Sequence, residues 1–135
     1  HFVEFTYEDD VKMYSQARQI GNCWNNVTEF VHGSQDTMEL GSNGSDGYRQ
    51  EHADLVAAIK DGTKLNDGWH GANSTMTAIL GRMATHSGQL VTWDEAIKSE
   101  EHLMPEQLAL DGPPPITVRE DGLYPVDQPG LYKPY

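Results

Sequence analysis

The chain has 135 residues, of which 37% are hydrophobic and 22% charged, a composition typical of a folded globular domain. The net charge of -12 argues against nucleic acid and anionic membranes as partners, because both attract basic surfaces. No apolar run approaches the roughly 20 residues that cross a bilayer. Cys23 is the single cysteine, which excludes an internal disulfide, and we expect it to be a small buried side chain.

The first residues of the chain read as part of a strand, and residue 1 is His rather than Met. They lack the basic start, the long apolar stretch and the small-residue cleavage site of a signal peptide. We therefore expect the chain to be a truncated part, or a proteolytic fragment, of a larger protein.

Residues 1–40 are predicted to form strands. Residues 2–7 are rich in aromatic and β-branched side chains, and the side chains of residues 11–20 alternate between two faces. The two segments flank a short acidic turn, which predicts a hairpin. A third strand over residues 24–32 and a short fourth over residues 37–40 follow after turn signals. Consecutive hairpins predict one open antiparallel meander, which can leave one face free for a partner.

Helices are predicted after a flexible loop at residues 41–47, which is rich in Gly, Ser, Asn and Asp. Residues 48–61 and 68–87 each carry apolar side chains on one stripe at helical spacing. Thr92 and Glu95 have the spacing of a capping box, which predicts a short third helix through about Ser99. The first stripe consists of Tyr48, His52, Leu55, Val56 and Ile59, and the second of Ala72, Met76, Ile79, Leu80 and Met83.

Cap residues are present at both ends of the two longer helices. Ser45 or Asp46 is predicted to cap the start of the first helix, and Gly62 to end it. Asn66 or Asp67 is predicted to cap the start of the second, and Gly88 to end it.

The last part of the chain has a different composition. All seven prolines lie between residues 105 and 134, interspersed with apolar side chains. Because this stretch is too apolar for a solvated linker, we expect an extended Pro-rich arm that lies on the domain or on a neighbouring subunit. The predicted organisation is an α+β sheet-and-helix domain at residues 1–102, with helices packed on one face of the open sheet, and the arm at residues 103–135.

Sequence motifs for catalysis and metal binding are absent. The chain has no His-Glu-x-x-His, no Gly-x-Ser-x-Gly and no Gly-x-Gly-x-x-Gly. Glu51 beside His52 at a helix start could serve in acid–base chemistry, or Glu51 could favour the positive helix end while His52 packs on the sheet. We assign no catalytic, cofactor-binding or metal-binding residue.

A set of polar and aromatic side chains falls on the predicted strands between residues 18 and 32. A sheet face that carries Arg, Asn, His and Trp can hold a sugar-like ligand through hydrogen bonds and stacking. The same residue types are also favoured at subunit interfaces, so both interpretations stay open. The residues concerned are Arg18, Trp24, Asn25, Asn26, Glu29, Phe30 and His32.

A set of segments, taken in their order along the chain, is specific as a set. These segments are residues 13–20, 23–27, 31–33, 48–55, 73–83, 87–93 and 122–130. Together they resemble the carboxy-terminal domain of the glucose–fructose oxidoreductase, inositol dehydrogenase and rhizopine-catabolism (Gfo/Idh/MocA) family, and the resemblance spans nearly the whole chain. The end of the chain is similar to the tails of bacterial members that often carry export signals.

In this family the domain follows a Rossmann domain, supplies part of the substrate pocket and often forms the dimer interface. The family's Glu-Lys-Pro and Asp-x-x-x-His motifs, which provide the catalytic Lys and His, have no counterpart in this chain. The resemblance therefore implies that the isolated chain is catalytically inactive and holds no cofactor of its own. It also implies a parent enzyme that uses NAD or NADP, in the bacterial periplasm or the cytoplasm.

The resemblance thus implies the substrate-binding and oligomerisation domain of an NAD(P)-dependent oxidoreductase that acts on a sugar, sugar acid or cyclitol. Its expected partners are the Rossmann domain, a sugar-like small molecule and a second copy bound through the sheet face. The alternative is a stand-alone dimerisation or carbohydrate-binding module without enzymatic activity. The candidates to line the substrate pocket are Arg18, Trp24, Asn25, His32, Tyr48 and His52.

Overall fold

The computed structural model describes residues 1–40 and 44–134, which divide into two compact units. The first unit combines residues 1–18 with the chain from His70 onward, and the second consists of Gln19–Trp69. Both units contain antiparallel strands and helical residues, so the predicted α+β class is confirmed. The elements are β1 (Phe2–Thr6), η1 (Glu8–Asp10), β2 (Lys12–Gln16), β3 (Phe30–His32), β4 (Thr37–Glu39), α1 (Gly44–Asp61), α2 (Gly68–Ser87) and α3 (Trp93–Ile97).

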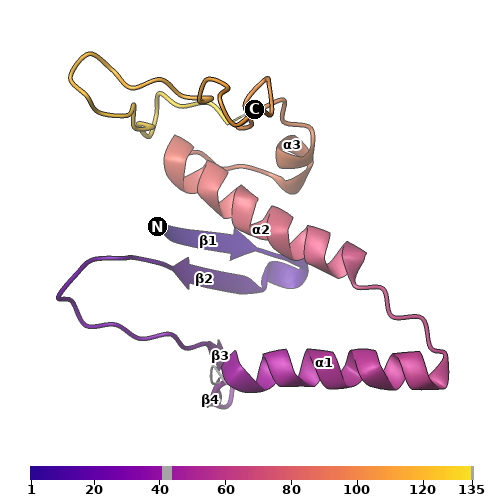
Figure 1. Ribbon diagram of the computed structural model, residues 1–135. Helices are drawn as coiled ribbons and strands as arrows, with labels where there is room; N and C mark the ends of the chain where they lie inside the picture. The colour runs from indigo at the N-terminus through magenta and orange to yellow at the C-terminus, as the bar shows by residue number, and fades with distance from the viewer. Residues whose placement is uncertain (41–43, 135) are drawn as a thin grey trace. The chain divides into compact units, whose positions relative to one another are not determined.

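The first unit begins with the predicted hairpin (Figure 1). Strands β1 and β2 pair antiparallel in a register that runs from Phe2 opposite Gln16 to Thr6 opposite Lys12. The acidic turn between them is the single 3-10 turn η1. Asp9 and Asp10 have φ of 59° and 60°, in the left-handed region that Asp tolerates better than most residues, so the turn chemistry agrees with the sequence.

Helix α2 spans the predicted range and lies against β1 (Figure 1). A Cβ atom at Gly81 would stand 2.9 Å from Cζ of Phe5 and 3.7 Å from Cγ2 of Val3. The missing side chain of Gly81 therefore creates the space that the inward-facing residues of β1 occupy. Met83 and Ser87 follow on α2 and are buried, together with Ala96 of α3.

The turn between α2 and α3 has the predicted helix ends. Gly88 has φ of 67° and donates its amide to the Ala84 carbonyl at 2.9 Å, which is the expected conformation of a glycine beyond a helix end. The capping box is confirmed: the Thr92 side chain accepts from the Glu95 amide, and the Glu95 carboxylate accepts from the Thr92 amide. Helix α3 ends at Ile97, two residues before the predicted Ser99.

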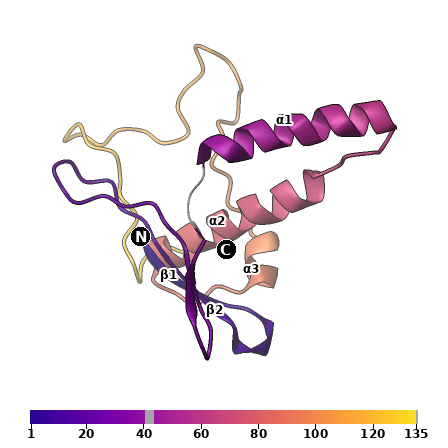
Figure 2. The same ribbon diagram turned by 90° about the horizontal axis from the view of Figure 1, so that it is seen from below.

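Residues 103–134 contain no helix or strand and follow an irregular path (Figures 1 and 2). The end of this stretch lies against α2. The Gly130 amide donates to the Ser87 carbonyl at 2.7 Å, and Ser99 donates its hydroxyl to the carbonyl of Pro134, which is fully buried. The boundary predicted between residues 102 and 103 stays a prediction.

In the second unit, the predicted single meander is wrong for the described residues. Strands β3 and β4 pair only with each other, with Val31 opposite Met38, and form a two-stranded sheet separate from β1 and β2. The strand predicted over residues 24–32 is limited to Phe30–His32. Asn25 and Asn26 have low strand propensity, so alternation alone did not define a strand there.

Helix α1 begins earlier than predicted. Residues 44–47 belong to its first turn, so this part of the predicted loop is wrong, and residues 41–43 lie outside the described part of the chain. Ser45 and Asp46 are consequently inside the helix rather than at its cap. An acidic residue in the first turn complements the positive helix end, which helps a Gly- and Ser-rich segment to be helical. Gly62, with φ of 70°, ends the helix as predicted.

In the second unit, no residue of 19–40 or 46–69 is buried. The apolar stripe of α1 is present as predicted in sequence, yet Tyr48 and Ile59 are each 72% exposed. Cys23, predicted to be buried, is exposed as well. The apolar residues of this unit are therefore available to another surface.

The Gly81 contact can be tested by substitution. We expect Gly81→Val to lower the free energy of unfolding by about 1–3 kcal/mol, because the β-branched side chain must displace Phe5. The matched control is Gly71→Ala in the same helix, where a Cβ atom meets nothing within 4 Å and improved helix propensity should stabilise by about 0.5–1 kcal/mol. Urea denaturation measures both, and equal effects would contradict the contact.

Candidate functional site

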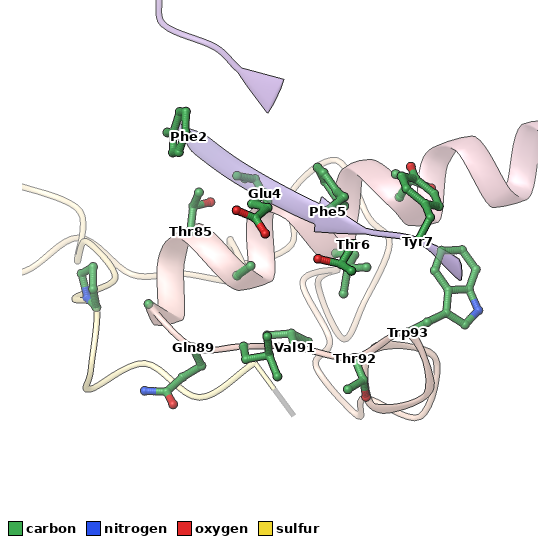
Figure 3. A pocket seen from close by; sticks show the side chains of 17 residues that line it. Phe2, Glu4, Phe5, Thr6, Tyr7, Thr85, Gln89, Val91, Thr92 and Trp93 are labelled. Atoms are coloured by element: carbon green, nitrogen blue, oxygen red, sulfur yellow. The ribbon is translucent and has the colours of Figure 1, made fainter. Parts of the chain in front are cut away.

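The first unit contains an open groove of about 920 Å³, a volume within the range of ligand-binding clefts. Strand β1 forms one wall and residues 88–93 form the other, with side chains of α2 between them (Figure 3). Tyr7 and Trp93 lie at one end, and Phe2 and Gln89 lie toward the other. The lining residues are Phe2, Val3, Glu4, Phe5, Thr6, Tyr7, Thr77, Leu80, Ala84, Thr85, Gly88, Gln89, Leu90, Val91, Thr92, Trp93 and Pro129.

The wall formed by β1 is an unpaired strand edge. His1 and Ala17 exchange two backbone hydrogen bonds of 2.8 and 2.9 Å, so His1 opposite Ala17 is a hydrogen-bonded pair. Such pairs alternate along an antiparallel ladder, which directs the amide and carbonyl groups of Phe2, Glu4 and Thr6 away from β2. Among the described residues no strand pairs with that edge. It therefore offers three donors and three acceptors at strand spacing.

The opposite wall has free backbone groups too. The Gln89 amide bonds the Ser87 hydroxyl and the Thr92 amide bonds the Glu95 carboxylate, whereas Leu90 and Val91 make no backbone hydrogen bond within the described chain. Leu90 is 89% exposed. The carboxamide of Gln89 likewise has no partner among the described residues. The groove thus presents unpaired polar groups on both sides of an apolar floor.

Most other polar side chains of the groove already have partners within the fold. Thr85 donates its hydroxyl to the Gly81 carbonyl at 2.8 Å, and Thr77 donates to the Asn73 carbonyl at 2.9 Å. The Lys12 ammonium donates to the Thr6 hydroxyl at 2.8 Å and lies 2.9 Å from the Glu4 carboxylate. Hydrogen bonding and charge attraction from Lys12 lower the pKa of Glu4, and Glu4 in turn raises the pKa of Lys12.

Acidic residues flank the end of the groove at Tyr7 and Trp93. Glu8, Asp9 and Asp10 follow Tyr7 directly, and Asp94 and Glu95 follow Trp93. Hydrogen bonds from the Thr92 side chain and backbone lower the pKa of Glu95, which keeps its carboxylate charged at neutral pH. The two segments that continue from this end of the groove are therefore acidic, and its two aromatic rings are partly exposed.

Four side chains meet where the C-terminal stretch contacts the end of α2. The His86 ring lies 2.7 Å through Nδ1 from the Asp127 carboxylate, stacks on His1 at 5.4 Å and contacts Tyr132 edge-on. Arg82 donates to the Tyr132 hydroxyl at 3.5 Å and pairs with Glu101. The contacts to Asp127 and Tyr132 attach the end of the chain to α2, and no local sequence pattern indicates them because the partners are far apart in the chain.

The six residues predicted to line a substrate pocket are all exposed, and none lines the groove. Arg18 belongs to the first unit and the other five to the second. Trp24 and Asn25 lie in the irregular segment before β3. Their assignment to a substrate pocket stays a prediction.

The histidines and the tyrosine of the predicted set have local partners. On β3, Nδ1 of His32 lies 3.1 Å from the Thr37 hydroxyl, and its ring is 6.3 Å from that of Phe30. On α1, Nδ1 of His52 donates to the Tyr48 carbonyl at 2.7 Å. This hydrogen bond leaves Nε2 of a neutral His52 as an acceptor directed away from the backbone.

The groove carries few groups that could take part in acid–base or metal chemistry. The groove contains hydroxyl and amide groups and one carboxylate. Among the residues that line it, Thr85 alone has a hydroxyl within hydrogen-bond distance of a histidine, His1. Within residues 1–40 and 44–134, no cluster of three His, Cys, Asp or Glu residues is arranged to hold a metal ion. The described helices are too short or too polar to span a bilayer.

The ion pair at the groove wall should be visible in a pH titration. Because Lys12 lowers the pKa of Glu4, the pair stabilises the hairpin above the ordinary glutamate pKa and loses this effect as pH falls through the lowered value. We expect the Glu4 carboxyl signal to titrate at a lower pH in the native chain than in Lys12→Met, as measured by carbon-detected NMR. The control Lys98→Met should leave it unchanged, and an unchanged Glu4 titration in Lys12→Met would refute the pairing.

No protein-family model matches the chain, and neither a curated protein sequence nor a solved structure matches it. The resemblance to the Gfo/Idh/MocA family therefore stays a prediction from the sequence.

Proposed function

We propose that the chain is the substrate-side and assembly domain of an NAD(P)-dependent oxidoreductase that acts on a sugar, sugar acid or cyclitol hydroxyl. In this proposal NAD or NADP is held by a Rossmann domain elsewhere in the parent protein, which also supplies the catalytic groups. This chain then contributes hydrogen bonds and aromatic surface to the substrate and contacts to the assembly.

One observation carries the proposal: the second unit presents polar and aromatic side chains without burying them. Trp24 is 76% exposed and Tyr48 72% exposed, and His32 and His52 are exposed as well. Trp and Tyr are highly buried on average in folded domains, so rings as exposed as these are available to a ligand or to a partner surface. Exposed aromatic rings together with hydrogen-bonding groups are what the recognition of a polyhydroxylated ligand requires.

The proposed roles follow from the chemistry of each residue. Arg18, Asn25, His32 and His52 would donate to or accept from substrate hydroxyls, and Trp24 and Tyr48 would stack on the apolar faces of the ring. The order of the elements is in keeping with the proposal, because the segments that resemble the family fall in sequence on β2, the stretch up to β3, α1, α2 and the turn before α3. Hydride transfer itself is assigned to the parent's other domain.

The proposal can be tested on the native gene product that contains this chain. We expect it to reduce NAD or NADP with at least one sugar, sugar acid or cyclitol, and Arg18→Ala or His32→Ala to raise KM or lower kcat about tenfold or more, since a site loses about 1–3 kcal/mol with each polar contact. The matched controls remove exposed side chains elsewhere: Arg119→Ala in the Pro-rich stretch and His102→Ala directly before it.

Unchanged kinetics in both Arg18→Ala and His32→Ala would reject the residue assignment. A gene product that reduces neither cofactor across a panel of these substrates would reject the oxidoreductase proposal itself.

A second candidate function, oligomerisation without enzymatic activity, is supported by the exposed apolar surface of β3 and β4. Phe30, Val31 and Met38 are each about half exposed, and Val31 lies opposite Met38 on one face of the sheet. A two-stranded sheet with an uncovered apolar face is marginally stable by itself, so a second copy that covers this face would stabilise it.

Sedimentation velocity distinguishes this candidate. We expect the chain to form a dimer that Val31→Lys/Met38→Glu converts to a monomer, since the opposed charges can pair within the sheet while they disfavour its burial. Val118→Lys/Leu123→Glu is the control in the Pro-rich stretch, at similar exposure. A chain that stays monomeric at the highest attainable concentration would eliminate this function.

A further inference from the structure

We propose that the groove beside β1 binds an extended peptide segment of a partner protein, which adds a strand to the free edge of β1 and carries basic residues at the end near Tyr7 and Trp93. The inference concerns the first unit and is independent of the function proposed above, whose residues lie outside the groove. It rests on the backbone groups, the apolar floor and the charge distribution of the groove.

The unpaired backbone groups of the groove are spaced to bind an extended ligand that carries amide groups. The amides and carbonyls of Phe2, Glu4 and Thr6 point away from β2, at the two-residue spacing of a strand, and no described strand pairs with them. Leu90 and Val91 line the facing wall, and their backbone groups have no hydrogen-bond partner among the described residues. An extended peptide satisfies donors and acceptors on such an edge by main-chain hydrogen bonds, which is the physical basis of strand addition.

The floor of the groove selects alternate apolar side chains. Successive side chains of a strand point to opposite faces, so every second side chain of an added strand would turn toward α2. There it meets Leu80 and Ala84, while Thr77 and Thr85 have their hydroxyls engaged within the helix. Small β-branched side chains such as Val and Thr match this lining and also favour the extended conformation.

Charge complementarity selects a basic partner and fixes its position. Five carboxylates, from Glu8, Asp9, Asp10, Asp94 and Glu95, follow the two residues that close one end of the groove. Tyr7 and Trp93 lie at this end and are 49% and 39% exposed, so their rings can also contact a cation. No basic residue lines the groove, and the Lys12 charge is directed to Glu4.

A second copy of the chain fits less well than a basic peptide. Its net charge is also -12, so its approach to the acidic end is repulsive. If two β1 edges paired about their centre, Glu4 of one copy would lie opposite Glu4 of the other, and like charges directly opposite each other destabilise a sheet.

The test uses the 135-residue chain and two synthetic peptides, acetyl-Val-Thr-Val-Thr-Val-Lys-Lys-amide and acetyl-Lys-Lys-Val-Thr-Val-Thr-Val-amide, for the parallel and antiparallel orientations. We expect one of them to bind saturably in a calorimetric titration and to shift the NMR amide signals of Phe2, Glu4, Thr6, Leu90 and Val91. The same peptide with N-methyl groups on alternate residues, or with Glu in place of Lys, should bind at least about tenfold more weakly, since it loses main-chain bonds or charge attraction.

Two matched pairs of variants locate the site. Thr6→Pro removes an edge amide without breaking a bond to β2, and Thr6→Val removes only the hydroxyl that Lys12 contacts. We expect Thr6→Pro to abolish peptide binding and Thr6→Val to retain it. Glu8→Gln/Asp9→Asn/Asp10→Asn should weaken binding about tenfold, because Asn also tolerates the positive φ of this turn, whereas Glu106→Gln/Asp111→Asn/Glu120→Gln, with the same change in charge, should not.

Each contrary result overturns the proposal. Binding that survives Thr6→Pro in a correctly folded hairpin, judged by its NMR signals, would place the peptide elsewhere. No binding of either peptide by the native chain would reject the site. A dimer of the native chain that Thr6→Pro dissociates in sedimentation would assign the edge to a second copy instead.

Discussion

The approach of β1 to α2 at Gly81 is the contact on which the rest of the first unit depends. With no side chain at position 81, Phe5 and Val3 can reach the helix surface, and the hairpin takes its position from them. The free edge of β1 then faces residues 88–93, which leave the helix through the left-handed turn at Gly88. A groove results that neither segment forms alone. Further along α2, the buried residue Met83 lies near Ala96 of α3, and the carbonyl of the buried residue Ser87 accepts a hydrogen bond from the Gly130 amide.

Local features of the sequence predicted local structure well. The spacing of apolar residues identified α2 to the residue, and Thr92 with Glu95 identified the start of α3, because a capping box needs only neighbouring groups. Features that depend on distant partners were not predicted. A strand forms only where another pairs with it, so alternation over residues 24–29 did not suffice. The groove joins residues 2–7 to residues 88–93, and His86 meets Asp127 across 41 positions, which no periodicity indicates.

The two units treat their apolar residues differently. The first unit has a small core on α2, whereas the second leaves its α1 stripe and the faces of β3 and β4 exposed. Burying a given apolar area stabilises a protein by roughly the same free energy, whether the area is buried within a unit or against another surface. The second unit therefore gains more stability from contact with another surface than the first unit does. Its exposed aromatic rings and histidines are available to take part in such a contact.

The first unit is discontinuous in sequence, because residues 19–69 lie between its hairpin and the rest of it. Closing a loop of this length costs roughly 3–4 kcal/mol of chain entropy, and doubling the length of the loop adds only about 0.6 kcal/mol. Insertions or deletions within residues 19–69 therefore have little effect on the stability of the first unit. On the ribosome, Gly81 is added about 4–15 s after Phe5 at ordinary rates of synthesis, and until then Phe5 has no helix to pack against. During that interval the face of the hairpin that carries Val3 and Phe5 is exposed together with the free edge of β1, and both are open to aggregation.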